Sequence, residues 1–226
     1  MTSYLAPVVL APIFNDFEPL PDGPVRSEVL KLADEAGVDV GNVYSVDASK
    51  RSTTLNAYVD GIGSTRRVVL YDNLVDAAER PALRSVVAHE LGHVHGDDVL
   101  RGIAFVVIVA LPGMLLAREL GDAIAARTGV RAGRPSALAA YALPIVLVAF
   151  VAGLAGNVLS RSIEERADRF AIELTGEPQG LIELQTEPAE RNLSNPDPPG
   201  WYQALFGTHP TTEQRIGIAE AYEQQP

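Results

Sequence analysis

The sequence contains no cysteine, and this absence removes several kinds of chemistry at once. Without thiols the chain has no disulfide framework, no thiolate metal ligand and no cysteine nucleophile. Histidine is also scarce, with four in 226 residues. A metal site in this chain would therefore be built from a few imidazoles together with carboxylates.

Positive charge is in short supply as well. Lys and Arg number 18 against 29 Asp and Glu, which gives a formal net charge of -11. Because phosphate binding needs a cationic surface, and no long Lys/Arg run is present, we expect no nucleic-acid partner. Arginine outnumbers lysine 16 to 2 and alanine is abundant, a bias typical of GC-rich bacterial genomes. The expected source is therefore a bacterium.

The apolar residues are concentrated in two uncharged runs, 102–117 and 137–159. As a helix the second run would cover roughly 35 Å, more than the hydrocarbon core of about 30 Å. The first would reach only about 24 Å, but Val99, Leu100 and a snorkelling Arg101 extend it. We expect transmembrane helices at about 100–118 and 137–159, in contact with membrane lipid. The alternative is a buried helical hairpin of a soluble protein.

Orientation in the membrane does not follow from the flanking charges. Near the two runs, five arginines lie on the side that carries residues 89–93, and four lie in the loop between the runs. The positive-inside rule needs a larger difference. The expected location is an integral position in a bacterial cell membrane, with either orientation open and no oligomeric state indicated.

Hydrophobic periodicity and turn residues predict the remaining elements. We expect helices at 25–36, 81–96, 160–184 (with Gly176 as a stop signal) and 211–222, strands at 43–46, 55–59 and 67–71, and a loop at 186–200. The three short strands, separated by Ser/Thr/Gly-rich turns, predict a small antiparallel sheet. Together these elements describe one mainly α-helical domain, residues 1–226.

The sequence HELGH occupies positions 89–93, within the predicted helix 81–96. Two histidines four residues apart project from one face of a helix, so His89 and His93 can bind a single Zn²⁺. The carboxylate of Glu90 beside them can take a proton from a water that the metal activates. This pattern predicts a zinc-dependent hydrolase.

A catalytic zinc needs a third protein ligand, and the segment after the second apolar run offers carboxylates. Glu164 and Asp168 are four residues apart on one face of the predicted helix, so Glu164 could bind the metal while Asp168 holds a histidine. Two membrane crossings between the motif and Glu164 would return the chain to its starting side. Glu165 is the main rival ligand, and a solvated acidic face is the alternative for the whole segment.

Several ordered motifs resemble those of the CAAX prenyl protease family and its bacterial heat-shock membrane metalloprotease relatives. The motifs are HELGH, SRSIEERAD at 160–168, NLSNP at 192–196 and THPTTEQRI at 208–216. The resemblance extends to APIFNDFEPLP at 11–21 and to the stretch 49–75. It implies that Glu164 is the third zinc ligand. It also implies that Asp168 contacts a metal ligand without binding the metal itself.

The same resemblance assigns further roles. It implies that Asn192 and His209 stabilise the tetrahedral intermediate, although by themselves Asn192 reads as a loop amide and His209 as a helix cap. It also implies that Asn56, Ala57 and Tyr58 bind an extended substrate along an edge strand; the alternative is an ordinary strand with Asn56 in a turn.

One departure concerns the start of the chain. Members of the prenyl-protease branch usually carry several membrane helices before a segment like APIFN, whereas this chain begins almost there. We therefore expect either a catalytic fragment that lacks N-terminal membrane helices or a shortened protein.

The complete expectation is a zincin-like metallopeptidase domain with a two-helix transmembrane hairpin inserted between the metal-ligand helices. Its activity would be zinc-dependent hydrolysis of peptide bonds in membrane-associated or misfolded proteins. The alternatives are C-terminal processing of prenylated proteins and a catalytically inactive membrane scaffold. Either activity requires protein or peptide substrates.

Overall fold

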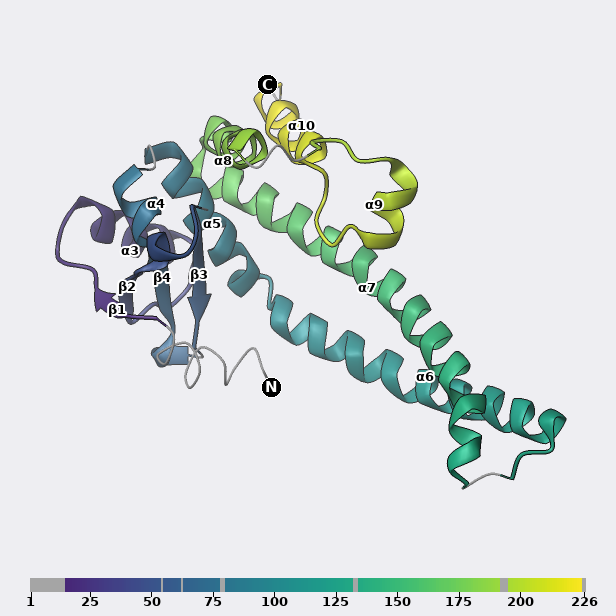
Figure 1. Ribbon diagram of the computed structural model, residues 1–226. Coiled ribbons are helices and arrows are strands. Elements are labelled where there is room, and N and C mark those ends of the chain that lie inside the picture. The colour runs from purple at the N-terminus through teal and green to yellow at the C-terminus, as the bar shows by residue number, and fades with distance from the viewer. Residues whose placement is uncertain are drawn as a thin grey trace. The chain divides into compact units, whose positions relative to one another are not determined.

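The computed structural model describes residues 15–53, 55–61, 63–77, 80–131, 134–191 and 195–224 (Figure 1). Two compact units divide these residues. The first comprises the residues up to Asp97, Ile163–Pro198 and those from Pro210 onward, and the second comprises Asp98–Ser162 and Pro199–His209.

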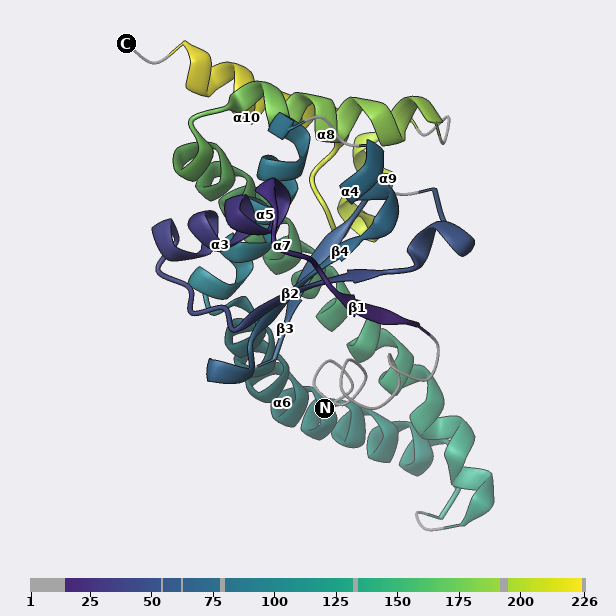
Figure 2. The same cartoon turned by 90° about the vertical axis from the view of Figure 1, so that its left-hand side faces the viewer.

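A four-stranded sheet forms one side of the first unit (Figure 2). Its strands are β1 (Phe17–Pro19), β2 (Asn42–Val46), β3 (Ala57–Asp60) and β4 (Arg67–Tyr71), in the spatial order β1-β2-β4-β3. The β1–β2 and β3–β4 pairs are antiparallel, whereas β2 and β4 run parallel.

The prediction of a purely antiparallel sheet was therefore wrong for its central pair. Tyr44 of β2 lies opposite Val69 of β4, with β3 displaced to the outside of β4. The chain leaves β2, forms β3 at the far edge, and returns through β4 between them. Residue periodicity reports which face of a strand is buried, but it does not report the order of strands in the sheet.

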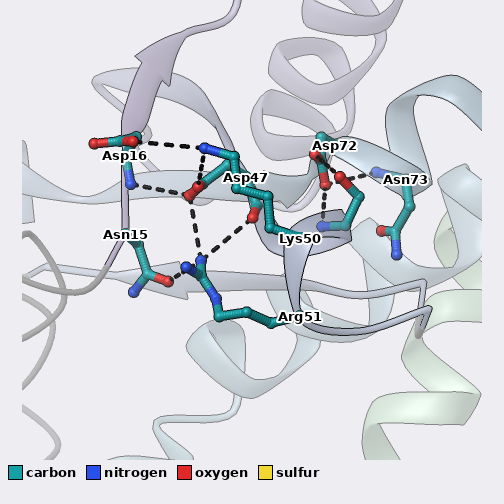
Figure 3. A network of polar contacts seen from close by, with 8 residues as sticks. Asn15, Asp16, Asp47, Lys50, Arg51, Asp72 and Asn73 are labelled. Carbon is teal, nitrogen blue, oxygen red and sulfur yellow. Dashed lines mark hydrogen bonds and ion pairs between the residues drawn. The ribbon is translucent and has the colours of Figure 1, made fainter.

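A polar network holds the segment that leads from β2 toward β3 (Figure 3). Asp47 forms an ion pair with Lys50 at 2.8 Å and accepts a hydrogen bond from the backbone N–H of Asp16 at 3.0 Å. The Lys50 and Asp16 contacts hold the pKa of Asp47 below its usual range. In the same segment, the backbone N–H of Ser49 donates to Asp72 at 2.8 Å. These contacts fix the short 3-10 turn Ala48–Lys50 before the edge strand.

The core of the first unit lies between the sheet and two helices, α3 (Pro24–Glu35) and α5 (Arg80–His95). The predicted apolar stripe of α5 is buried, with Val87 and Leu91 fully enclosed against Leu70 of β4 and Leu32 of α3. Burying each such side chain contributes about 1.5–3 kcal/mol. This packing fixes the rotation of α5, and with it the direction of the residues on its other face.

The C-terminal helices of the first unit differ in part from the prediction. The helix carrying Glu164 is continuous with the second apolar run as α7 (Leu138–Thr175), and it ends at Gly176, whose φ is +66°. Helix α8 (Pro178–Arg191) extends beyond residue 184, where the predicted helix ended, into the predicted loop. Its first half packs on α10 (Thr212–Glu223). The helix predicted from Thr211 begins there in the structure: Thr211 is the N-cap of α10 and forms a capping box with Gln214.

The second unit consists of α6 (Asp98–Thr128), residues 138–162 of α7 and the short helix α9 (Gly200–Phe206), with a 3-10 turn at Pro135–Ala137. Glycine permits the close approach of α6 and α7, because a Cβ on Gly121 would overlap the ring of Tyr141. Helix α9 begins at Gly200, the last residue of the predicted loop, and occupies a segment for which no element was predicted. Pro112 and Pro144 both lie inside continuous helices, which membrane helices tolerate.

Both helices expose their apolar side chains along most of their length. Ile108 is 70% exposed, Met114 63%, Val146 62% and Val151 64%. Each helix is long and apolar enough to cross a membrane, and the expected spans 100–118 and 137–159 fall within them. A buried hairpin would have these side chains covered, so the exposure favours helices that cross a membrane.

Candidate metal centre

Three side chains of the first unit converge on one point. His89 and His93 lie one turn apart on α5, with their Nε2 atoms 3.2 Å apart. From α7, the carboxylate oxygens of Glu164 lie 3.4 Å from Nε2 of His89 and 3.7 Å from Nε2 of His93. Within the described residues, this is a group whose ligand atoms, all within 4.8 Å of one another, could hold a metal ion.

The spacing suits a small tetrahedral ion. Two atoms bound about 2.0–2.1 Å from a tetrahedral zinc lie about 3.3 Å apart. The nitrogen–nitrogen and nitrogen–oxygen distances in the cluster bracket this value. Two imidazoles and one carboxylate also leave a fourth position open, as catalytic zinc sites require.

A glycine in the motif brings the two ligand helices together. A Cβ on Gly92 would lie 3.1 Å from Cδ1 of Phe170 and 3.3 Å from Cα of Ala167, both on α7. Even a Cβ there would require Phe170 or the α7 backbone to move by a few tenths of an ångström, and a larger side chain would require more. Gly92 therefore places Glu164 within reach of the two histidines, a role that the sequence analysis did not assign to it.

Asp168 holds His89 from the side opposite the cluster. Its side chain is fully buried, and its Oδ1 lies 2.9 Å from Nδ1 of His89. The carboxylate accepts the Nδ1 proton, which leaves the lone pair on Nε2 directed toward the cluster. The structure thus places Asp168 where the sequence predicted a partner for a histidine.

Arg215 completes this arrangement, and the sequence analysis did not single it out. From α10 it donates two hydrogen bonds to Asp168, through Nε at 2.7 Å and Nη2 at 2.6 Å. The capping box at Thr211 fixes the first turn of α10, which carries Arg215. An arginine is rarely buried unless it pairs with a carboxylate, but its burial is not visible in the sequence, so no local signal pointed to Arg215.

The buried charges shift one another's pKa values. Burial alone would lower the pKa of His89, but hydrogen bonds to Asp168 and Glu164 raise it to about 9 in the metal-free protein. Burial would raise the pKa of Asp168, yet the contacts with His89 and Arg215 bring it below its ordinary value. Asp168 is therefore an anion that favours positive charge on its histidine neighbour.

Glu90 stands beside the ligands on α5 and is half-buried. Its burial raises its pKa above the usual value for a glutamate. A carboxylate whose pKa is moved toward neutrality is better suited to accept a proton and later return it than an ordinary surface glutamate. Its position and its environment both match general acid–base chemistry.

The rival ligand Glu165 lies outside the cluster. Its side chain is 49% exposed and pairs with Arg169 at 2.7 Å along the surface of α7. This is the solvated acidic face that the sequence analysis kept as the alternative for the segment. It applies to Glu165, whereas Glu164 and Asp168 turn inward.

The other predicted site residues lie in other parts of the chain. Asn192 lies outside the described residues. His209 belongs to the second unit, where its Nδ1 lies 2.9 Å from the Thr208 hydroxyl. Ala57 and Tyr58 lie in β3 with Asn56 immediately before them, at an edge of the described sheet and packed against α5.

Comparison with known proteins agrees with this geometry. The sequence model of peptidase family M48 matches residues 19–223. The chain is 33% identical over 228 residues to "Uncharacterized metalloprotease YhfN" of Bacillus subtilis (strain 168), covering 99% of this chain and 54% of that protein. It is 34% identical over 229 residues to "CAAX prenyl protease 1 homolog" of Oryza sativa subsp. japonica, covering 97% and 52%.

A solved structure shows the same fold. The crystal structure of S. mikatae Ste24p matches with a TM-score of 0.82 at 24% sequence identity, over 97% of this chain and 55% of that one. The chain thus spans about half the length of the relatives it matches. The resemblance seen in the motifs is confirmed, and the chain belongs to peptidase family M48.

Proposed function

We propose that this chain is a zinc-dependent metalloendopeptidase that hydrolyses peptide bonds of membrane-associated or misfolded proteins. The observation that carries the proposal is the convergence of His89, His93 and Glu164, with Glu90 beside them. Family membership supports a metal-dependent peptidase with protein or peptide substrates.

The three convergent residues would hold the metal. Their spacing supports zinc, and two imidazoles with one carboxylate are a common ligand set of catalytic zinc. When bound, the ion supplies a Lewis acid that polarises the scissile carbonyl and lowers the pKa of water toward about 7. Asp168, itself held by Arg215, keeps His89 in the orientation and tautomer that binding needs.

Glu90 would move the proton. With its pKa raised by burial, its carboxylate takes a proton from the attacking water and delivers it to the leaving amine. Asn192 and His209 are proposed to donate hydrogen bonds to the developing oxyanion, on the family resemblance of their motifs. The role of Glu90 rests on its position in the structure, whereas the roles of Asn192 and His209 rest on their sequence motifs.

The free edge of β3 supports an extended substrate. The carbonyl of Asn56 accepts a hydrogen bond from the N–H of Tyr71 in β4 at 3.0 Å, so the alternation of an antiparallel pair turns the N–H of Ala57 outward. That N–H donates to the side-chain oxygen of Asn56 at 2.9 Å. A substrate backbone lying alongside Asn56, Ala57 and Tyr58 would accept a hydrogen bond from the Ala57 N–H in place of the Asn56 side chain and would extend the sheet.

The exposed apolar faces of α6 and α7 support a membrane location, in which the chain forms a single membrane-embedded domain in contact with lipid. A bacterial cell membrane is the proposed site. The net charge of -11 supports the absence of a nucleic-acid partner.

A second candidate activity is C-terminal processing of prenylated proteins. The observation that favours it is the identity shared with proteins named CAAX prenyl protease 1 homolog, from rice and from Arabidopsis thaliana. The same metal centre would serve either substrate class, and so the activities differ in what the chain binds.

Glu90→Gln tests the proposal most simply. The variant should keep its metal and lose peptide cleavage by about 10²–10⁴-fold, because the general base is removed while the ligands stay in place. Glu165→Gln on the exposed face of α7 is the matched control and should cleave normally. Survival of cleavage in Glu90→Gln would overturn its role, and a metal-loaded native chain that cleaves neither a membrane-protein substrate nor a prenylated peptide would indicate a scaffold.

A further inference from the structure

Helix α9 presents a cluster of aromatic side chains to the outside of the second unit. Trp201 is 65% exposed, Tyr202 48% and Phe206 55%, and no residue of α9 is buried. The rings contact one another, with centroids 5.9 Å apart for Trp201 and Tyr202 and 5.3 Å apart for Tyr202 and Phe206. Adjoining aromatic rings exposed on so short a helix indicate a contact surface.

Hydrogen bonds fix α9 at one level of α7, beside which it lies in Figure 1. Asn157 donates its side-chain N–H to the carbonyl of Leu205 at 2.8 Å. Arg161 donates to the carbonyl oxygens of Gln203 and Gly207. Asn157 and Arg161 of α7 thus bind backbone carbonyls in the last turn of α9 and just after it.

This level is the end of the apolar run. Residues 138–159 of α7 carry no charge, and Arg161 is the first charged residue after them. Within the same unit, Val158 is 59% exposed and Phe150 49%, so the apolar outer face of α7 extends up to the level where α9 is attached. The aromatic cluster of α9 therefore continues an apolar surface at the point where it becomes polar.

Tryptophan and tyrosine gather at that kind of boundary. Their rings are apolar while the indole N–H and the phenol O–H need polar partners, so they favour the headgroup region of a bilayer over its core and over water. The second unit thus has apolar side chains along its helices and amphipathic rings where the apolar run ends. That sequence of surfaces matches the layers of one leaflet.

We propose that α9 is an interfacial anchor, in which Trp201, Tyr202 and Phe206 lie in the headgroup region of a phospholipid bilayer where α7 leaves the hydrocarbon. This inference rests on the membrane location proposed above. The occupant of the surface is lipid, because the cluster is continuous with the apolar face of α7 and is attached where that face becomes polar.

The native chain provides its own probe, because Trp201 is its single tryptophan. The full chain is reconstituted in phosphatidylcholine/phosphatidylglycerol vesicles containing lipids spin-labelled either near the headgroup or deep in the acyl chain. Loss of Trp201 emission should be larger with the shallow label than with the deep one. A matched reference is Trp201→Phe combined with Phe150→Trp, which moves the tryptophan to the middle of α7 and should be quenched more by the deep label.

The two probes separate the failures. If the Phe150→Trp reference is quenched by the deep label while Trp201 is quenched by neither label, α9 faces water or a protein partner and the anchor is overturned. Stronger quenching of Trp201 by the deep label would also overturn it, since α9 would then lie in the hydrocarbon. If neither probe is quenched, the membrane location itself is wrong and the inference falls with it.

Discussion

Arg215 and Asp168 form a two-pronged ion pair in which each carboxylate oxygen accepts one guanidinium hydrogen bond, at 2.7 and 2.6 Å. Asp168 is fully buried and also holds His89 at 2.9 Å. A buried carboxylate without a counter-charge is costly, so Arg215 keeps Asp168 ionised and correctly turned. The last helix of the chain is thereby connected to the metal centre through one side chain.

Replacing Arg215 should weaken metal binding without touching a ligand. Loss of a partner outside the metal shell typically costs about 10–100-fold in metal affinity, and we expect that range for Arg215→Ala in a chelator-competition titration. Arg215→Lys should recover part of the loss, because one ammonium cannot make both bonds. Arg169→Ala, an exposed arginine of α7, is the control. A folded Arg215→Ala chain with native affinity would show that Arg215 is not a positioning residue.

Metal affinity should depend on pH through His89. Hydrogen bonds to Asp168 and Glu164 outweigh burial and raise its pKa from 6.5 to about 9, so the metal-free chain binds a proton that the metal must displace. The apparent affinity should therefore rise about tenfold per pH unit and level off near pH 9. Asp168→Asn removes a contact that raises this pKa, and its plateau should begin at lower pH. An affinity that is flat between pH 6.5 and 9 would contradict this reading.

The stability of the metal-free chain should change in the opposite direction. Because the folded pKa of His89 is raised, its ion pair with Asp168 stabilises the fold fully below pH 6.5 and loses that effect as the pH rises toward 9. Chelator-treated protein should accordingly unfold at lower denaturant concentration at pH 9 than at pH 6.5. The metal-loaded protein should lack this His89-dependent decline, since the bound ion keeps the imidazole neutral.

Much of this architecture follows from sequence periodicity. The apolar stripe of 81–96 predicted α5, because one face of that helix is buried, and the helix predicted at 211–222 corresponds to α10. The parallel β2–β4 pair was not predicted, since strand order depends on which edges meet in space. Helix α8 was predicted only as far as residue 184, because the residues from 186 to 200 are rich in proline, asparagine and aspartate, which is typical of a loop.

The metal centre also has a part that follows from the sequence and a part that depends on the fold. His89, Glu90 and His93 share a short motif whose helical spacing already places them together, whereas Glu164 needed the resemblance to be preferred over Glu165. Arg215 carries no local signal, because its role depends on Asp168, 47 residues earlier in the chain. The packing role of Gly92 could not be predicted either, because it depends on α7: a Cβ on Gly92 would lie 3.3 Å from Cα of Ala167.

Gly92 offers a purely steric test. Gly92→Val should push Phe170 and Ala167 away, separate Glu164 from the histidines, and lower both metal affinity and stability, the latter by about 1–3 kcal/mol as for overpacked cores. The control is Gly217→Ala on α10, where a Cβ meets nothing within 4 Å and where alanine should stabilise the helix. Calorimetric titration and denaturant unfolding measure both effects. Native metal affinity in Gly92→Val would show that the close approach of the helices is not needed.

The most direct test of the centre is the metal content of detergent-purified protein, measured by mass spectrometry in the native chain, Glu164→Ala and Glu165→Ala. The two glutamates are adjacent on α7, one turned into the cluster and one paired with Arg169 on the surface. We predict about one zinc per native chain and per Glu165→Ala chain, with marked loss in Glu164→Ala. No stoichiometric metal in the native chain, or loss with Glu165→Ala alone, would contradict the proposed site.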